Sequence, residues 1–87
     1  SDLLAAYQLR GTVLALAAGF VGQVAPDQLD EGMVVAKQAR AEYVDDGSGL
    51  AQKADAVIEA VEFADQTKVV PASKAFADAC TSVDPGT

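Results

Sequence analysis

Nonpolar side chains recur every three or four residues along most of the chain, which is the spacing of an α-helix. The pattern predicts four helices, over residues of about 2–24, 27–44, 50–68 and 72–83. Their short connections predict that successive helices are antiparallel neighbours. We therefore expect one all-α domain over residues 1–87, a small up-and-down bundle of three long helices and a short C-terminal helix.

Prolines, glycines and short polar residues mark the expected helix boundaries. Pro26 suits the first turn of the second helix. The segment 45–49, Asp-Asp-Gly-Ser-Gly, is the clearest loop, and Ser48 in it is expected to cap the third helix. Pro71 predicts the break before the fourth helix, because proline disfavours helical geometry in the residue before it.

Small residues recur along the first helix at Gly11, Ala15, Gly19 and Gly22. This spacing places them on one helix face, where a neighbouring backbone can approach closely. In membranes such faces form helix dimers, and in other chains they also pack within the molecule. We treat the face as a candidate interaction surface, for a protein partner or a second copy, and leave intramolecular packing open.

The same helix contains an apolar run over residues 11–24 that is superficially similar to a signal-peptide core. Ten residues that include Asp2 precede the run, and a bilayer span needs about 20 apolar residues. A buried helix is therefore the favoured interpretation, and we expect no membrane span. The chain is expected to be soluble, either cytoplasmic or secreted after removal of a signal that this sequence does not contain.

Arg40 projects close to the middle of the nonpolar stripe of the second helix. A charge in that position has to be paired or has to reach water. Carboxylates on a facing helix, such as Glu59, Glu62 or Asp65, are the expected partners. The sequence thus predicts an ion pair, partly or fully buried, between Arg40 and Glu59 or Glu62.

The composition favours closely packed helices with a core made mostly of small side chains. The chain contains 18 alanines and 11 valines, but three phenylalanines and no tryptophan. Alanine has the highest helix propensity and lets helices approach closely. The third helix is expected to bury Phe63, and the fourth to bury Phe76 and Cys80.

The net charge of −7 argues against a nucleic-acid partner, because phosphate contacts need clustered lysine or arginine. The six basic residues are scattered along the chain. An acidic surface is a better electrostatic match for a basic protein.

The residue inventory also argues against catalysis and against a metal or other cofactor. Histidine, the commonest acid–base group and metal ligand, is missing. Acidic residues at the start of the second helix complement its dipole, and Asp45 and Asp46 lack the spacing of a calcium loop. Cys80 is the only cysteine, so it is either a small buried residue or a thiol for an intermolecular bridge.

In size, acidity and number of helices, the chain resembles acyl carrier proteins. These carry phosphopantetheine on a serine in an Asp-Ser-Leu motif at the start of a helix. Residues 46–50 read Asp-Gly-Ser-Gly-Leu, so glycines separate Ser48 from both neighbours, and the serine precedes the third helix rather than the second. The resemblance implies a small-molecule or acyl-type carrier with an apolar cavity as the alternative to an interaction module.

Overall fold

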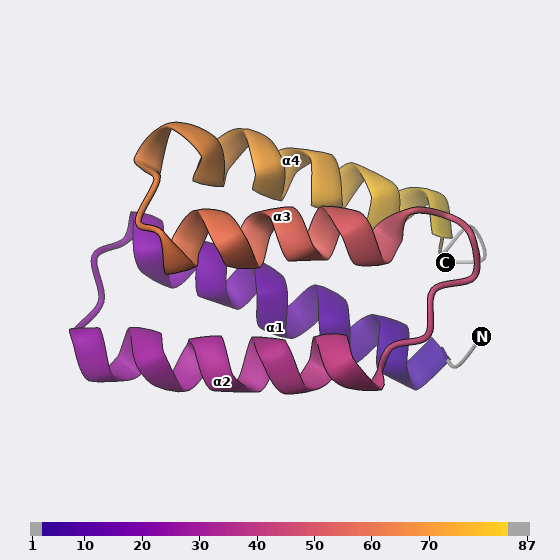
Figure 1. Cartoon of the computed structure of the whole chain (residues 1–87), viewed down its shortest axis with the longest axis horizontal. Coiled ribbons are helices and arrows are strands. Elements are labelled where there is room, and N and C mark those ends of the chain that lie inside the picture. The colour runs from indigo at the N-terminus through magenta and orange to yellow at the C-terminus, as the bar shows by residue number, and fades with distance from the viewer. Residues whose placement is uncertain (1–2, 84–87) are drawn as a thin grey trace.

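The computed structural model describes residues 3–83, and that range is all-α with no strand. Its helices are α1 (Leu3–Val21), α2 (Pro26–Glu42), α3 (Leu50–Glu62) and α4 (Gln66–Val83). Each helix runs opposite to the one before it (Figure 1). The prediction of an all-α chain with four helices is confirmed, while the expected first helical residue, Asp2, lies outside the described residues.

The four helices do not have equivalent positions. α1 and α3 each pack against the other three helices, whereas α2 and α4 pack against α1 and α3 but not against each other. The cross-section is therefore a rhombus with α1 and α3 across its short diagonal. The largest fully buried side chains in this core are Phe76, Leu9, Leu50, Val13, Val57 and Val69.

The end of α1 is set by local backbone hydrogen bonds. Val24 N–H donates to Gly19 O at 3.1 Å, and Gln23 N–H donates to Phe20 O at 3.2 Å. Gln23 has a φ of 59°, so the chain turns through a left-handed residue, as in the Schellman motif. The motif stops the helix before Pro26 is reached.

The break between α3 and α4 lies at residues 63–65, not at Pro71 as the sequence predicted. Ala64 has a φ of 53°, and Asp65 N–H donates to Ala60 O at 2.8 Å, which repeats the motif that ends α1. α3 is consequently the shortest helix, with 13 residues, and α4 has 18. Phe63, expected in the core, falls at the end of α3 and is 75% exposed.

Asp65 explains why α4 begins where it does. Its Oδ1 accepts hydrogen bonds from Thr67 N–H at 3.2 Å and from the Thr67 hydroxyl at 2.7 Å, as an N-cap side chain does. The bond from the Thr67 side chain is the main reason that the pKa of the Asp65 carboxyl lies below its usual value. The ionised Asp65 carboxyl therefore stabilises the folded chain at pH values above the usual carboxyl pKa. This stabilisation is lost as the pH falls through the lowered pKa of the folded state.

The loop over residues 43–49 uses its own acidic and hydroxyl groups to begin α3. Asp45 Oδ1 accepts the N–H of Ala51 at 3.2 Å, and Ser48 Oγ accepts the N–H of Leu50 at 3.2 Å. Asp46 Oδ1 accepts the N–H of Ser48 at 3.1 Å. The N-cap residue itself is Gly49, so Ser48 supports the start of α3 from one residue earlier than a cap, and Asp45 bonds the second helical N–H.

Candidate functional site

The outer face of α1 is the most unusual surface of the molecule. α1 buries Ala5, Leu9, Val13, Leu16 and Ala17 on the side that faces the other helices. Its opposite side is as apolar as the buried one, and Arg10 is the only charged residue in the whole helix. A helix that is apolar all round is normally enclosed on all sides, but here the outer side is exposed. We refer to Gly11, Leu14, Ala15, Ala18 and Val21 as the α1 outer face.

The small residues of α1 divide into two groups. Gly11 and Ala15 are exposed, and a Cβ atom added at Gly11 would meet nothing within 4 Å. Intramolecular packing therefore does not account for these two residues. A Cβ atom at Gly19 would lie 3.3 Å from the Val24 side chain, and Gly22 follows the end of α1 with its N–H bonded to Ala18 O. Gly19 and Gly22 thus serve the turn into α2.

A groove of about 430 Å³ runs along the α2 side of the α1 outer face. From α1 it is lined by Gly11 and Ala15 together with Gln8 and Thr12, and from α2 by Gly32 and Val35 together with Gln28 and Glu31. Glu31 is the one charged residue among those that line it. A neighbouring groove along the same two helices is lined by Glu42. The α2 flank of α1 therefore combines apolar residues with uncharged polar ones, and its charged lining residues, Glu31 and Glu42, are acidic.

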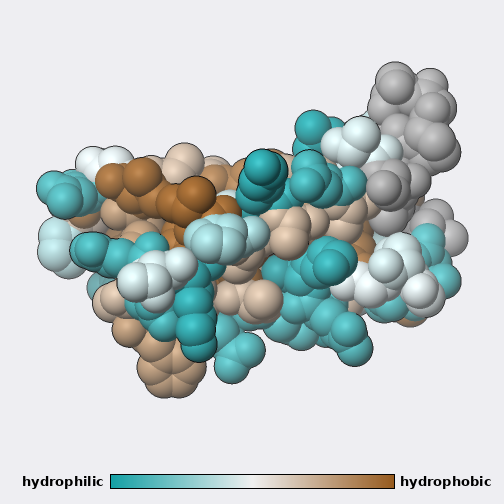
Figure 2. All heavy atoms as spheres, turned by 90° about the horizontal axis from the view of Figure 1, so that it is seen from above, coloured by the Kyte–Doolittle hydropathy of each residue, from teal (hydrophilic) through white to brown (hydrophobic). Residues whose placement is uncertain are grey.

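A second groove, of about 420 Å³, runs along the α4 side of α1. Leu14, Ala18 and Val21 line it from α1, and Val70 lines it from α4. Its one charged lining residue is Lys74. Figure 2 shows apolar surface gathered at the end of the molecule where the end of α1 meets the start of α4.

Both grooves include residues that the sequence did not single out, such as Val35 and Val70. The signal that could have found the surface was the lack of charge around α1. Periodicity identifies a buried side by its contrast with a polar side, and α1 has no such contrast.

By length and composition, α1 is also able to cross a membrane, contrary to our expectation of no such segment. The core helix of a protein passes the same test, but such a helix is mostly buried. In α1 only 28% of the apolar window is buried. Arg10 lies near the middle of the helix, and an arginine at a bilayer centre costs about 2.5–3.5 kcal/mol on insertion scales. The other side of α1 packs against three helices that carry many charges. A protein covering fits these features better than lipid does.

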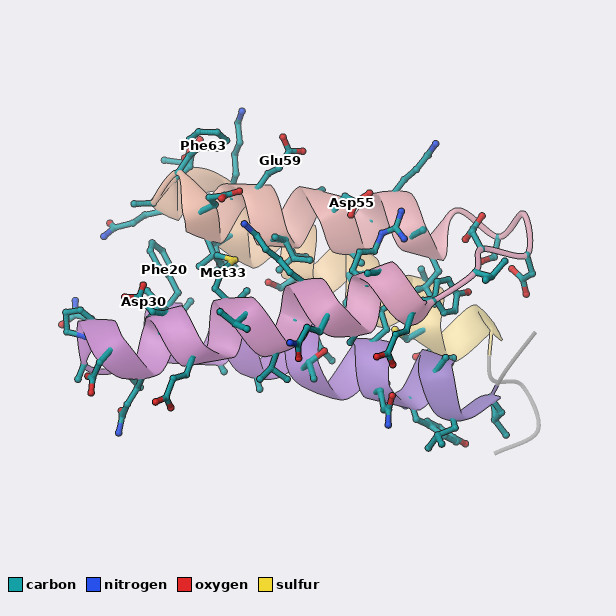
Figure 3. All side chains as sticks on the ribbon, turned by 60° about the horizontal axis from the view of Figure 1, so that its bottom comes forward. Phe20, Asp30, Met33, Asp55, Glu59 and Phe63 are labelled. Atoms are coloured by element: carbon teal, nitrogen blue, oxygen red, sulfur yellow. The ribbon has the colours of Figure 1, made fainter. Side chains whose placement is uncertain are left out.

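Arg40 pairs with Asp55 rather than with Glu59 or Glu62. Its Nε donates to Asp55 Oδ1 at 2.8 Å, and an Nη donates to Oδ2 at 3.3 Å. Glu62 accepts a hydrogen bond from Lys37 Nζ at 2.8 Å, and Glu59 projects away from α2 (Figure 3). The prediction was wrong by about one helical turn, because the antiparallel register of α2 and α3 is not visible in sequence spacing.

The Arg40–Asp55 pair stabilises the α2–α3 contact only modestly. The two side chains remain 31% and 46% exposed, so water screens their attraction. We expect a double-mutant cycle with Arg40→Met and Asp55→Asn to give a coupling energy of about 0.5–1 kcal/mol in urea unfolding. The matched cycle of Arg40→Met with Glu59→Gln is expected to give no coupling, and the reverse ranking would contradict the described register.

Cys80 is 5% exposed and belongs to the core, as the alternative of a small buried residue predicted, so a thiol for an intermolecular bridge is not presented at the surface. Burial raises the pKa of the thiol, and the nearby charge of Arg10 opposes that effect. Both the burial and the raised pKa lower the reactivity of the sulfur.

Cys80 should therefore react slowly with a thiol reagent in the folded chain. We expect its labelling by Ellman's reagent to be at least about tenfold slower than in 6 M urea. An Ala15→Cys variant in a Cys80→Ala background is the control, since residue 15 is exposed, and it should react rapidly in both conditions. Equal rates for Cys80 in the two conditions would show that this part of the core is open.

No group of three or more potential ligands is positioned to hold a metal ion among residues 3–83. The most unusual polar group there is the hydroxyl of Tyr43, which is buried without a hydrogen-bond partner that meets geometric limits. Burial raises the pKa of the Tyr43 phenol, and the nearby Ser48 side chain opposes the effect.

Comparisons with protein-family models, with curated protein sequences and with solved structures find no match to this chain.

Proposed function

We propose that this chain is an up-and-down helical bundle that acts as a non-enzymatic protein-interaction module. Its binding surface is the α1 outer face together with the two grooves beside it. The observation that carries the proposal is the exposure of one whole side of a helix that contains a single charged residue.

Contiguous exposed apolar surface of this kind marks interaction sites, whereas scattered apolar residues do not. Here Leu14, Ala18 and Val21 of α1 adjoin Val70 of α4 in one groove. The charges are concentrated on the other helices, as at the rim of a protein interface. A protein partner or a second copy would cover the apolar strip, and a basic partner would in addition meet the acidic residues on α2.

A carrier role receives less support from the same residues. Ser48, the serine of the carrier-like segment, uses its hydroxyl as an acceptor at the start of α3. The two grooves beside α1 lie on the surface, between neighbouring helices. We therefore favour the interaction module.

Photo-crosslinking in the host cell tests the binding surface. Benzoylphenylalanine is placed at Ala18, which is exposed on the α1 outer face, and in a matched control at Ala41, which is exposed on α2 and lines neither groove. We expect a protein adduct from position 18 and none from position 41. Failure to obtain an adduct at position 18, or equal adducts at both positions, would refute the proposed surface.

A further inference from the structure

We propose that the occupant of the α1 outer face is a second copy of this chain, in a two-fold dimer with parallel α1 helices. The inference rests on the proposed function and names the partner of the same surface. It follows from three observations, namely the lack of charge on the face, the opposite charges of its two flanks and the extent of the apolar strip.

The α1 outer face can lie against itself without bringing like charges together. Each copy carries a net charge of −7, but none of it is on the five residues of this face. Gly11 and Ala15 are small and exposed, so two α1 helices can approach closely along them. The exposed Val21 and the partly buried Leu14 then face the grooves of the other copy.

The charges beside α1 decide how the two copies are oriented. The cations lie on the α4 side, where Lys74 lines the groove and Arg10 is close enough to act on Cys80. The carboxylates of Glu31 and Glu42 lie on the α2 side. The α4 side also carries the carboxylate of Asp78, one helical turn after Lys74, so these three residues give it a net charge of +1 (two cations and one carboxylate) against −2 from Glu31 and Glu42.

A two-fold axis parallel to the bundle brings the α2 side of each copy to the α4 side of the other. Arg10 then faces the acidic residues of the partner's α2 at the level of Glu42, because Gln8 and Thr12 of α1 line a groove together with Glu42. An antiparallel dimer would instead place the acidic residues of the two α2 helices opposite each other. Electrostatic complementarity thus favours the parallel arrangement.

The extent of the strip is compatible with a dimer of modest affinity. Leu4 and Tyr7, which are 63% and 40% exposed, continue the apolar strip from the α1 outer face toward the start of α1. α1 has 19 residues and is about 28 Å long, and its neighbours lie about 8–10 Å to either side. The projected area of the strip is therefore about 500 Å², and its accessible area is larger because the side chains are not flat. A standard interface buries about 800 Å² on each partner. A dissociation constant in the micromolar range is expected for this area.

Sedimentation equilibrium of the purified chain between about 1 and 200 µM tests the inference. We expect a reversible dimer, and we expect Ala15→Glu to weaken it at least about thirtyfold by burying an unpaired carboxylate. Ala41→Glu is the matched control, an exposed alanine of α2 outside both grooves, and should leave the dimer intact. Far-UV circular dichroism checks that both variants remain helical.

Two further sets of variants test the orientation. In a Cys80→Ala background, Ala15→Cys is expected to form a disulfide-linked dimer on mild oxidation, since residue 15 of both copies lies near the axis. Arg10→Glu and Glu42→Arg should each weaken the dimer about three- to tenfold, and the double variant should restore it. A double variant no tighter than the single ones would overturn the parallel arrangement.

The outcomes separate this inference from the proposed function. A wild-type chain that remains monomeric at 200 µM overturns the dimer, and so does a dimer that Ala15→Glu leaves unchanged or that Ala41→Glu weakens equally. A crosslinked adduct at Ala18 that contains a different protein would overturn the dimer while supporting the interaction module. Adducts of twice the chain mass support both.

Discussion

Phe76→Ala is expected to lower the free energy of unfolding by about 3–5 kcal/mol. Phe76 is fully buried and is the largest such side chain in the core. Many of the other buried residues of the core are alanines and valines, whose short side chains cannot extend to fill the cavity. A chain of this length has about 5–10 kcal/mol of total stability, so the variant should lose a large part of it.

Urea unfolding followed by circular dichroism, at one low micromolar concentration, measures the effect of Phe76→Ala. Phe63→Ala is the matched control, because Phe63 is 75% exposed at the end of α3. Its loss should remain within about 0.5 kcal/mol. If the two substitutions destabilised the chain equally, the core would not be the one described.

Pro71→Ala is expected to raise the free energy of unfolding by about 1–3 kcal/mol, which is unusual for a single substitution. Pro71 lies inside α4, in the second turn after its start at Gln66. A proline there cannot donate to the carbonyl oxygen of Thr67, four residues earlier, and its ring crowds that oxygen. Alanine removes both penalties and has the highest helix propensity.

The same urea experiment distinguishes the described α4 from the helix break that the sequence predicted. If Pro71 lay at a break, its replacement would change stability by less than about 0.5 kcal/mol. Pro26→Ala is the control, since Pro26 lies at the start of α2, where proline is favourable. That variant should be neutral or slightly destabilised, so the two Pro→Ala substitutions are expected to differ in sign or in size.

Local signals in the sequence predicted a large part of the fold. The helical spacing of apolar residues located four helices, and the loop at residues 45–49 was found from its glycines and aspartates. Ser48 was expected to cap α3, and its hydroxyl does accept the N–H of Leu50, although the N-cap residue is Gly49. Each of these features depends on interactions within a few residues of the chain, and such interactions are encoded in short windows of sequence.

The boundary between α3 and α4 was predicted wrongly because two local signals competed there. Pro71 is the stronger helix breaker by residue type, but Asp65 caps α4 six residues earlier and Ala64 accepts the left-handed conformation. The left-handed residue that ends a helix is usually glycine or asparagine, so neither Ala64 nor Gln23 indicates a helix end by its residue type. The exposed position of Phe63 follows directly from this shift of the helix boundary.

The sequence by itself determined that the chain is helical and approximately how many helices it forms. It also determined which side is buried in each helix whose other side is polar. Packing in three dimensions decided the rest. The register of α2 against α3 selected Asp55 as the counter-ion of Arg40. The rhombic arrangement left one side of α1 without a covering helix. Periodicity describes one helix at a time, whereas an ion pair or an exposed face depends on where the neighbouring helices lie.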